Sequence, residues 1–236
     1  MSFTWVRAAL IVFAAAVVLL AAVFFVYIGW EGMGPFQGLS MIRINRQYRN
    51  RPMGEIIFYG ASNFTLWKDL EQDMLPFIVQ NHGFGGSTDN DMMKYADQGL
   101  YSYQPQIVVF QSGSNDFVIG MTLEEVYANK TKMYTTFREH LPGAVFVVLS
   151  MLPLPGRAGH WADSDRVNAF LRDYCDTHER MIFVDATGDL MTPQGGFRPE
   201  LYVKDGIHLN RDGRDIWGPL IKNALREASG SGPELL

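Results

Sequence analysis

The longest apolar stretch in the chain runs from residue 8 to residue 30 and contains no charged residue. As a helix it would be about 35 Å long, enough to cross a hydrocarbon core of roughly 30 Å. Aromatic residues stand near its two ends, at Trp5, Tyr27 and Trp30, as is typical of a membrane interface. We therefore predict one transmembrane helix within residues 1–30. A cleaved signal peptide is the alternative, although its apolar region would be shorter, roughly 7–15 residues.

A different pattern begins at residue 54, where short apolar runs alternate with amphipathic stretches. Apolar runs that are buried on both faces and separated by helices are typical of a parallel sheet in an α/β sandwich. Strands are predicted at residues 55–60, 77–81, 106–111, 144–150 and 181–185. Helices are predicted at residues 66–74, 89–98, 122–140, 164–177 and 211–227.

The remaining segments complete the predicted domain organisation. Residues 1–30 form the anchor, residues 31–53 a linker with a short helix near 39–48, and residues 54–227 the folded domain. The linker is interpreted either as a solvated connector or as a segment whose arginines touch anionic lipid headgroups. Residues 228–236 are predicted to be a disordered tail.

The net charge and the cysteine content argue against some classes of protein. The formal net charge is -5 and the pI is about 5.5, so the chain lacks the basic character of nucleic-acid-binding domains. The one cysteine, Cys175, excludes a disulfide within the chain and lies in a helical apolar pattern, which favours a core position.

Arginines flank the predicted anchor unequally. Arg7 precedes it, while Arg43, Arg46, Arg49 and Arg51 follow it, and a simple count would place the following domain in the cytoplasm. A short positive flank before a first apolar segment is, however, the usual layout of a signal anchor, and large domains cross the membrane despite some positive charge. We therefore predict a single-pass membrane protein whose folded domain is extracytoplasmic.

Polar residues that could perform chemistry follow the predicted strands. Chemistry in open parallel sheets sits at the carboxyl ends of the strands. Ser62 follows the first strand, Gly86 lies in a glycine-rich loop after the second, and Asn115 follows the third. Near the last helix, Asp205 stands three residues before His208, a spacing at which a carboxylate can reach the imidazole. Together these residues could supply a nucleophile, a base with its orienting acid, and oxyanion donors.

Each of these features has a simpler interpretation. Ser62 and Asn115 could cap helices, and glycines in such a loop could only make a turn. Asp205 with His208 could be half of a metal site, but no second histidine or cysteine stands at metal spacing around them. The glycine-rich loop could cradle a phosphate, but it departs from the G-x-G-x-x-G pattern and no lysine follows as in a P-loop.

Four segments taken together carry a more specific signal: FYGASNFTLW, NHGFGGST, SGSNDF and DGIHLN. In this order they resemble the conserved blocks of the SGNH/GDSL hydrolases, and the likeness covers residues 54 to about 226. They are especially similar to a bacterial subgroup related to platelet-activating-factor acetylhydrolase-like and carbohydrate esterases. The resemblance implies a flavodoxin-like three-layer α/β/α sandwich with five parallel strands.

The resemblance also implies roles for individual residues. It makes Ser62 the nucleophile, His208 the base and Asp205 the acid that orients the base. The oxyanion hole would be formed by Ser62, Gly86 and Asn115, with no metal or organic cofactor. The chain departs from the family's Gly-Asp-Ser-Leu signature because Ala61 stands where the aspartate would be. That aspartate is not the triad acid, so its loss concerns how the nucleophile loop is held, and with it rate and substrate range.

The expected activity is hydrolysis of short-chain esters, such as acetyl groups on envelope glycans or lipids. Aromatic residues near the predicted loops, namely Phe84, Phe117 and Trp161, are predicted to line the substrate pocket, whereas His160 is predicted to lie at the surface. Two alternatives stay open: an O-acyltransferase that uses the same triad, and a non-catalytic binding module anchored to the membrane. The sequence does not determine the oligomeric state.

Overall fold

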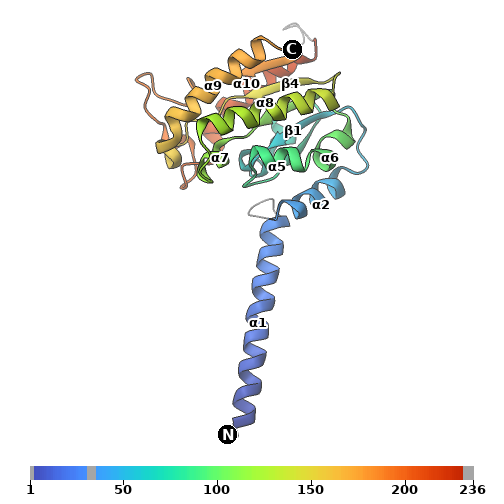
Figure 1. Cartoon of the computed structure of the whole chain (residues 1–236), viewed down its shortest axis with the longest axis vertical. Helices are drawn as coiled ribbons and strands as arrows, with labels where there is room; N and C mark the ends of the chain where they lie inside the picture. Colours follow the sequence, from blue (N-terminus) through green and yellow to red (C-terminus); the bar gives the residue numbers. More distant parts are fainter. Residues whose placement is uncertain (1–2, 31–35, 231–236) are drawn as a thin grey trace.

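The computed structural model describes residues 3–30 and 36–230, and it consists of a long helix and a folded domain (Figure 1). The long helix, α1 (Phe3–Trp30), extends away from the domain. Its segment from Val6 to Tyr27 has a mean hydropathy of 3.1, and none of it is buried against the domain. Such a helix is long and apolar enough to cross a membrane, although a signal sequence would meet the same criterion.

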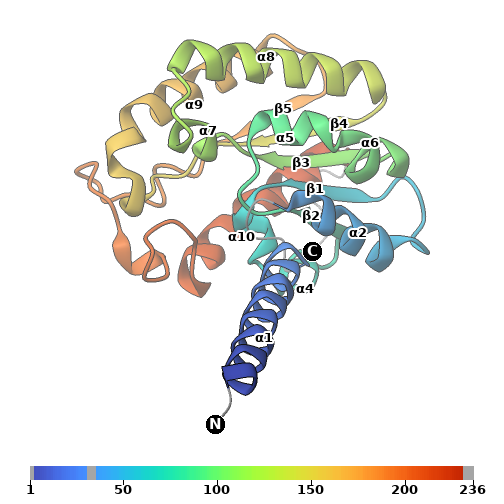
Figure 2. The same ribbon diagram turned by 60° about the horizontal axis from the view of Figure 1, so that its bottom comes forward.

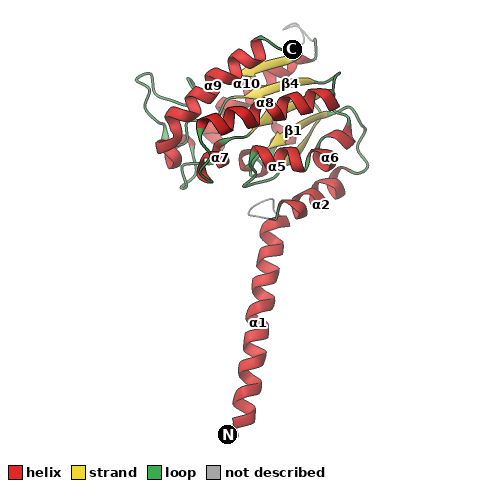
Figure 3. Ribbon diagram, in the orientation of Figure 1, coloured by secondary structure: helices red, strands yellow, loops and turns green. Residues whose placement is uncertain are grey.

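The domain is built on a five-stranded parallel sheet (Figure 3). The strands lie in the order β2-β1-β3-β4-β5, which is the flavodoxin-like order, and every neighbouring pair is parallel. The predicted fold class is therefore confirmed. The strands are β1 (Ile56–Gly60), β2 (Val79–Gly83), β3 (Ile107–Gln111), β4 (Val145–Leu149) and β5 (Met181–Val184).

Helices cover both faces of the sheet because alternate strand residues point to opposite faces and both sets are apolar. Figure 2 shows α8 and α9 on one side of the sheet and α10 on the other. The first face carries α2 (Gln37–Tyr48), α5 (Asp89–Lys94), α6 (Ala96–Gly99), α8 (Leu123–His140) and α9 (Trp161–Asp176). The second carries α3 (Ser62–Thr65), α4 (Leu70–Asp73) and α10 (Arg211–Ala228), while the short α7 (Ser114–Val118) follows β3. Three 3-10 helices complete the described elements: η1 (Tyr101–Tyr103), η2 (Pro155–His160) and η3 (Pro199–Leu201).

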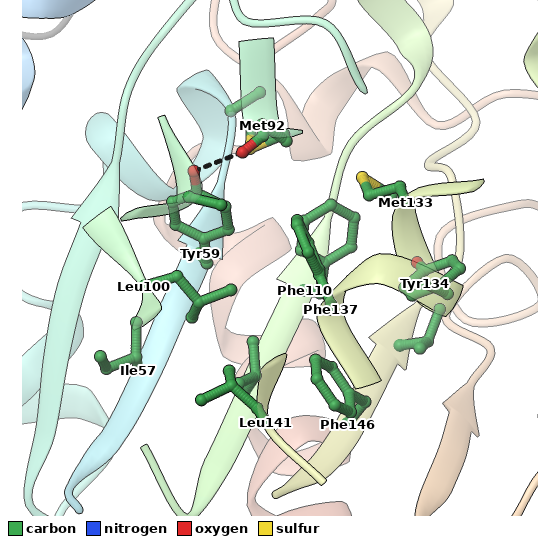
Figure 4. Close-up of a cluster of buried hydrophobic side chains, with 14 of the residues drawn as sticks. Ile57, Tyr59, Met92, Leu100, Phe110, Met133, Tyr134, Phe137, Leu141 and Phe146 are labelled. Atoms are coloured by element: carbon green, nitrogen blue, oxygen red, sulfur yellow. Dashed lines mark hydrogen bonds between the residues drawn. The ribbon is translucent and has the colours of Figure 1, made fainter. Parts of the chain in front are cut away.

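The core on the first face is rich in aromatic side chains (Figure 4). Tyr59 of β1 lies among Phe110 of β3 and Phe137 of α8, with ring centroids 6.1–6.2 Å from its own. Its hydroxyl is buried as well and donates to the Met92 carbonyl oxygen at 2.8 Å, so its polar end does not weaken the core. Cys175 is also buried, as the sequence predicts, and burial raises the pKa of its thiol to about 12.

The segment predicted to be a linker contains α2, which packs as part of the domain. Met41, Ile44 and Tyr48 are buried in the first-face core. The Tyr48 hydroxyl donates to the Glu71 carboxylate at 2.6 Å and accepts from the Asn81 backbone N–H at 3.0 Å, which ties α2 to β2. The predicted domain start at residue 54 thus lies inside packed structure, and residues 37–48 are not a free connector. Residues 31–35 and 231–236 lie outside the described residues.

Several element boundaries differ from those predicted, most clearly in one strand and two helices. The second strand begins two residues later than expected, because Ile78 is exposed whereas the polar side chains of Gln80 and His82 are buried. Burial is tolerated there since Gln80 donates to Glu55 at 2.7 Å and the His82 imidazole bonds to the Gly99 carbonyl at 2.6 Å. The helix predicted at 66–74 is shorter, because only α4 (Leu70–Asp73) falls within it, and α3 precedes it. The helix predicted at 89–98 is divided into α5 and α6.

Candidate active site

Ser62 is the first residue of α3, directly beyond the carboxyl end of β1. The turn that raises it there depends on Gly60. A Cβ atom at that position would come within 2.5 Å of the Gln111 carbonyl oxygen and 2.8 Å of the Phe64 ring. Only a glycine allows β1 to pass this close to the end of β3, and so the Ser62 side chain is presented at the rim of the sheet.

His208 and Asp205 meet Ser62 across that rim. The Ser62 Oγ atom lies 2.7 Å from His208 Nε2, and His208 Nδ1 lies 2.7 Å from Asp205 Oδ2. An ionised carboxylate only accepts hydrogen bonds, so the ring proton of a neutral His208 belongs on Nδ1. Nε2 is then the acceptor for the Ser62 hydroxyl proton. This is the arrangement in which an imidazole can activate a serine.

The backbone of the Asp205–His208 turn fixes the carboxylate. Asp205 Oδ1 accepts from the N–H groups of Ile207 at 2.7 Å and His208 at 3.0 Å. Partial burial raises the pKa of Asp205, but these bonds and the one from the His208 ring outweigh it and hold the pKa below its ordinary value. The carboxylate therefore stays ionised at neutral pH, as an orienting acid must.

Asn63 joins the two halves of the site and was not singled out in the sequence. Its Oδ1 accepts from the Leu209 backbone N–H at 3.2 Å, which links the residue after Ser62 to the residue after His208. A second link lies nearby, where the Arg214 guanidinium of α10 donates to the Leu66 carbonyl at 2.9 Å. These bonds span about 146 residues of sequence and hold the two loops in register.

The predicted oxyanion residues lie on the neighbouring loops. Gly86 has a φ of 73°, in the left-handed region, and it is exposed. The Asn115 side chain donates one amide proton to the Ser87 carbonyl at 2.8 Å, and a carboxamide has a second proton to offer. The Ser62 backbone N–H is at the first position of α3, where no carbonyl within the helix can accept from it. All three groups are thus able to serve as donors.

The three aromatic residues that were predicted to line the substrate pocket differ in how deeply they are buried. Phe84 does not line a pocket, and this prediction is wrong: its side chain is fully buried in the first-face core, with its ring 5.5 Å from that of Tyr59. A residue that follows β2 on the core-facing side packs inward whatever its distance from a glycine-rich loop. Phe117 is only 5% exposed and stacks on the half-exposed His160 ring at 5.9 Å. Trp161 is half-exposed and borders a small hollow with Ser114.

A buried ionic cluster lies beneath the oxyanion loops. The Lys130 ammonium of α8 is 3.0 Å from Asp89 Oδ1 and 2.9 Å from the Ser112 hydroxyl, and both charged side chains are essentially inaccessible. The Asp89 backbone N–H in turn donates to the Asp116 carboxylate at 3.1 Å. Asp89 follows the Gly86 loop, and Asp116 follows Asn115, so the cluster holds the two predicted oxyanion loops against one another.

Burial and the neighbouring charges in this cluster shift the pKa of Asp116. Burial, reinforced by the negative charge of Asp89, raises the pKa of Asp116 to about 7, while the Lys130 charge opposes the rise. Asp89 Oδ2 is buried and has no hydrogen-bond partner among the described residues. The raised pKa means that Asp116 takes up a proton more readily than an exposed aspartate, which limits the cost of burying a second carboxyl group beside Asp89.

No cluster of three or more histidine, cysteine, aspartate or glutamate side chains that could hold a metal ion occurs within residues 3–30 and 36–230.

Comparison with known proteins gives a family and a set of similar folds. The family model described as the GDSL-like Lipase/Acylhydrolase family matches residues 56–216. Comparison with the curated proteins finds no match. Several solved structures share the fold, all at low sequence identity.

Three of these structures illustrate the likeness. A protein from Streptococcus pneumonia, described as a platelet activating factor, is 18% identical in sequence to this chain. The TM-score is 0.71, and the match covers 90% of this chain and 99% of the other protein. A GDSL-like lipase from Bacteroides thetaiotaomicron is 19% identical, with a TM-score of 0.64 over 80% and 98%. A carbohydrate esterase family 3 protein from Talaromyces cellulolyticus is 18% identical, with a TM-score of 0.58 over 74% and 97%. At such identities the likeness establishes the fold.

Proposed function

Because the chain belongs to the GDSL-like lipase/acylhydrolase family and is therefore an ester-hydrolysing enzyme, we propose that Ser62, His208 and Asp205 form its catalytic triad. The observation that carries this proposal is the continuous chain of hydrogen bonds from the Ser62 hydroxyl through the His208 ring to the Asp205 carboxylate, with both distances at 2.7 Å. The same three residues stand in the sequence blocks that resemble the family.

Acylation begins when the Ser62 oxygen attacks the ester carbonyl carbon and its proton passes to His208 Nε2. The negative charge on the former carbonyl oxygen is stabilised by the N–H groups of Ser62 and Gly86 and by the Asn115 amide. The bond to the alcohol then breaks, and His208 returns the proton to the leaving alkoxide. Asp205 stabilises the imidazolium that exists between these two transfers.

Deacylation repeats the sequence with water. His208 takes a proton from the attacking water, the acyl–Ser62 bond breaks, and the proton returns to Ser62 as the carboxylic acid leaves. The net reaction converts an ester and water into an acid and an alcohol. It uses no group beyond the side chains and backbone N–H groups already named.

We propose that the acyl group is short, with acetyl as the first candidate, and that the substrate is an envelope glycan or lipid. The family and the fold shared with a carbohydrate esterase support this class of substrate. The apolar helix α1, which could hold the domain at a membrane, supports a substrate located there.

The activity is tested by comparing aryl acetate, butyrate and longer-chain esters with the wild-type chain and with His208→Ala. We expect kcat/KM to fall as the acyl chain lengthens. We expect His208→Ala to lose at least about 10³-fold of the acetate activity, because Ser62 then has no base. Equal turnover of acetate by the two chains would discard the proposed mechanism.

We further propose that α1 is a single-pass anchor and that the domain is extracytoplasmic. Ser102→Cys places a thiol at an exposed position, whereas the native Cys175 is buried and serves as the internal control. We expect a membrane-impermeant maleimide to label Ser102→Cys in right-side-out vesicles without detergent, and to leave the wild type unlabelled. Labelling that occurs only in inverted vesicles would place the domain in the cytoplasm.

A further inference from the structure

The Arg157 guanidinium lies near two parts of the proposed catalytic site, the segment before Asn115 and the charge of Asp205. Arg157 belongs to η2 in the loop after β4, and the preceding Gly156 is packed onto the Asp205–His208 turn. The Gly156 backbone N–H donates to the Gly206 carbonyl at 2.9 Å, and a Cβ atom at Gly156 would come within 2.2 Å of the Asp205 carbonyl oxygen. The backbone that carries Arg157 is therefore fixed against the turn that holds the proposed base.

From this position the side chain reaches the other side of the site. Arg157 Nη1 donates to the Ser114 hydroxyl at 2.8 Å, and Ser114 directly precedes Asn115, a proposed oxyanion donor. Arg157 thus contacts the loop after β3 through its side chain, while the preceding Gly156 packs on the turn of Asp205 and His208.

Arg157 is charged but unpaired. Within the part of the chain that the structure describes, no carboxylate lies within 4.0 Å of its nitrogens, and its one side-chain bond is to the neutral Ser114 hydroxyl. A guanidinium carries five N–H donors, so four are not used by Ser114. Burial lowers the pKa of Arg157 and the nearby Asp205 charge raises it, yet an arginine keeps its charge at neutral pH. A half-buried cation with free donors is a binding site for an anion.

The surroundings fit an organic molecule that carries this anion. A small hollow beside the guanidinium is lined by Ser114, Leu154, His160 and Trp161. Its walls combine two aliphatic side chains, Leu152 and Leu154, and two aromatic ones with the polar edge formed by Arg157 and Ser114. The hollow itself has room for only about one water molecule. The carbon skeleton of a substrate would therefore lie over the half-exposed rings of His160 and Trp161 at its edge, while the guanidinium holds the charge.

We propose that Arg157 selects esters whose acyl or alcohol part carries an oxyanion, that is, a carboxylate or a phosphate. The planar fork of the guanidinium matches either group with two parallel hydrogen bonds. This inference rests on the proposed esterase function and narrows its substrate class. It gives Arg157 a role in specificity and leaves the proton transfers to Ser62 and His208.

A structural role is the rival explanation. Arg157 could serve only to balance the charge of Asp205 and to hold the loop after β4. In that case its loss would slow every ester equally, because the triad itself would be disturbed. If Arg157 determines specificity, its loss would instead slow the anionic esters more than the neutral ones.

The test uses the full chain in a non-ionic detergent and two matched pairs of acetyl esters. The first pair is meta-acetoxybenzoate and its neutral amide, meta-acetoxybenzamide, which test the carboxylate. The second pair is acetylglycerol phosphate and acetylglycerol, which test the phosphate. Release of acetate gives kcat and KM for each ester, and the readout is the ratio of kcat/KM for the anionic ester to that for its neutral partner.

We expect this ratio to favour the anionic member of at least one pair in the wild type. In Arg157→Gln the ratio should fall about 10- to 100-fold, mainly through KM, since two charge-assisted hydrogen bonds to the substrate are lost. Arg157→Lys should keep part of the preference because it keeps the charge but loses the fork. The control is Arg166→Gln on α9, an exposed arginine paired with Asp163, which should leave the ratio unchanged.

Two results would overturn the inference: a ratio that is the same in the wild type and Arg157→Gln, or an equal loss of kcat/KM for both members of each pair.

A binding measurement separates failure of this inference from failure of the proposed function. Calorimetric titration of meta-acetoxybenzoate and of acetylglycerol phosphate into Ser62→Ala, and into Ser62→Ala with Arg157→Gln, needs no turnover. If the wild type released no acetate from any ester, the esterase proposal would fall. Weaker binding of either anionic ester by the double variant would still support the anion site, and equal binding of both would refute it.

Discussion

Replacing Ser62 by alanine is expected to lower kcat for an aryl acetate by at least about four orders of magnitude. The variant loses the oxygen that forms the acyl intermediate, so His208 can act only on water. Residual activity would come from the oxyanion donors and substrate binding alone. A fluorophosphonate probe, which reacts with activated serines, should label the wild type at residue 62 and leave Ser62→Ala unlabelled.

A second serine supplies the control for this experiment. Ser102 is exposed in η1, and Ser102→Ala should retain full activity and full labelling. The melting temperatures of all three chains should agree closely, because Ser62 is at the surface end of a strand and fills no core volume. Persistent turnover by a folded Ser62→Ala chain would show that another group carries the reaction.

Replacing Lys130 by methionine is expected to lower the free energy of unfolding by about 3–5 kcal/mol. Methionine fills a similar volume, so the loss comes from charge: Asp89 would be left buried without its cation. The Ser112 hydroxyl, which bonds both side chains, cannot replace a full positive charge. The measurement is denaturant unfolding of the full chain in detergent, followed by tryptophan fluorescence.

The same variant should show a characteristic dependence on pH. The Lys130 charge lowers the pKa of Asp116, so without it the pKa of Asp116 in the folded state rises further above its unfolded value of about 4. The folded state then binds more protons than the unfolded state, so stability falls as the pH rises from about 4 towards and beyond 7. The destabilisation relative to wild type should therefore be larger at pH 8 than at pH 5.

Lys132→Met offers a matched comparison two residues along the same helix. Lys132 is exposed, and its replacement should change stability by less than about 0.5 kcal/mol. If Lys130→Met were no less stable than Lys132→Met, the buried ion pair would contribute nothing to the fold. If its loss were the same at both pH values, the account of the carboxyl groups would need revision.

The sheet could be predicted from the sequence because parallel strands that are buried on both faces stand out as apolar runs between helices. The second strand is the exception. It runs along one edge of the sheet through Gln80, Asn81 and His82, whose burial is made possible by hydrogen bonds to distant residues. Hydrophobic pattern alone carries no information about such partners, and the predicted strand was therefore placed two residues too early.

The polar residues of the candidate active site could be predicted only in part. Ser62 could be predicted as a candidate because it follows the first strand, and Asp205 and His208 because they stand three residues apart before the last helix. Asn63 and Arg157 were missed, since their partners lie at sequence distances of 146 and 43 residues and no local pattern connects them. Lys130 was missed for another reason: in a long amphipathic helix a lysine is usually solvated, and its burial follows from carboxylates on other elements.

The order in which the proposed site appears along the chain has a consequence for biosynthesis. Ser62 emerges directly after the first strand, while the turn with Asp205 and His208 emerges just before the last helix, whose Arg214 fastens it to Leu66. A growing polypeptide thus has no competent reaction centre until nearly all of it has been made. A messenger cut short between the codons for residues 62 and 208 would yield a product that contains α1 and the proposed nucleophile but lacks the proposed base.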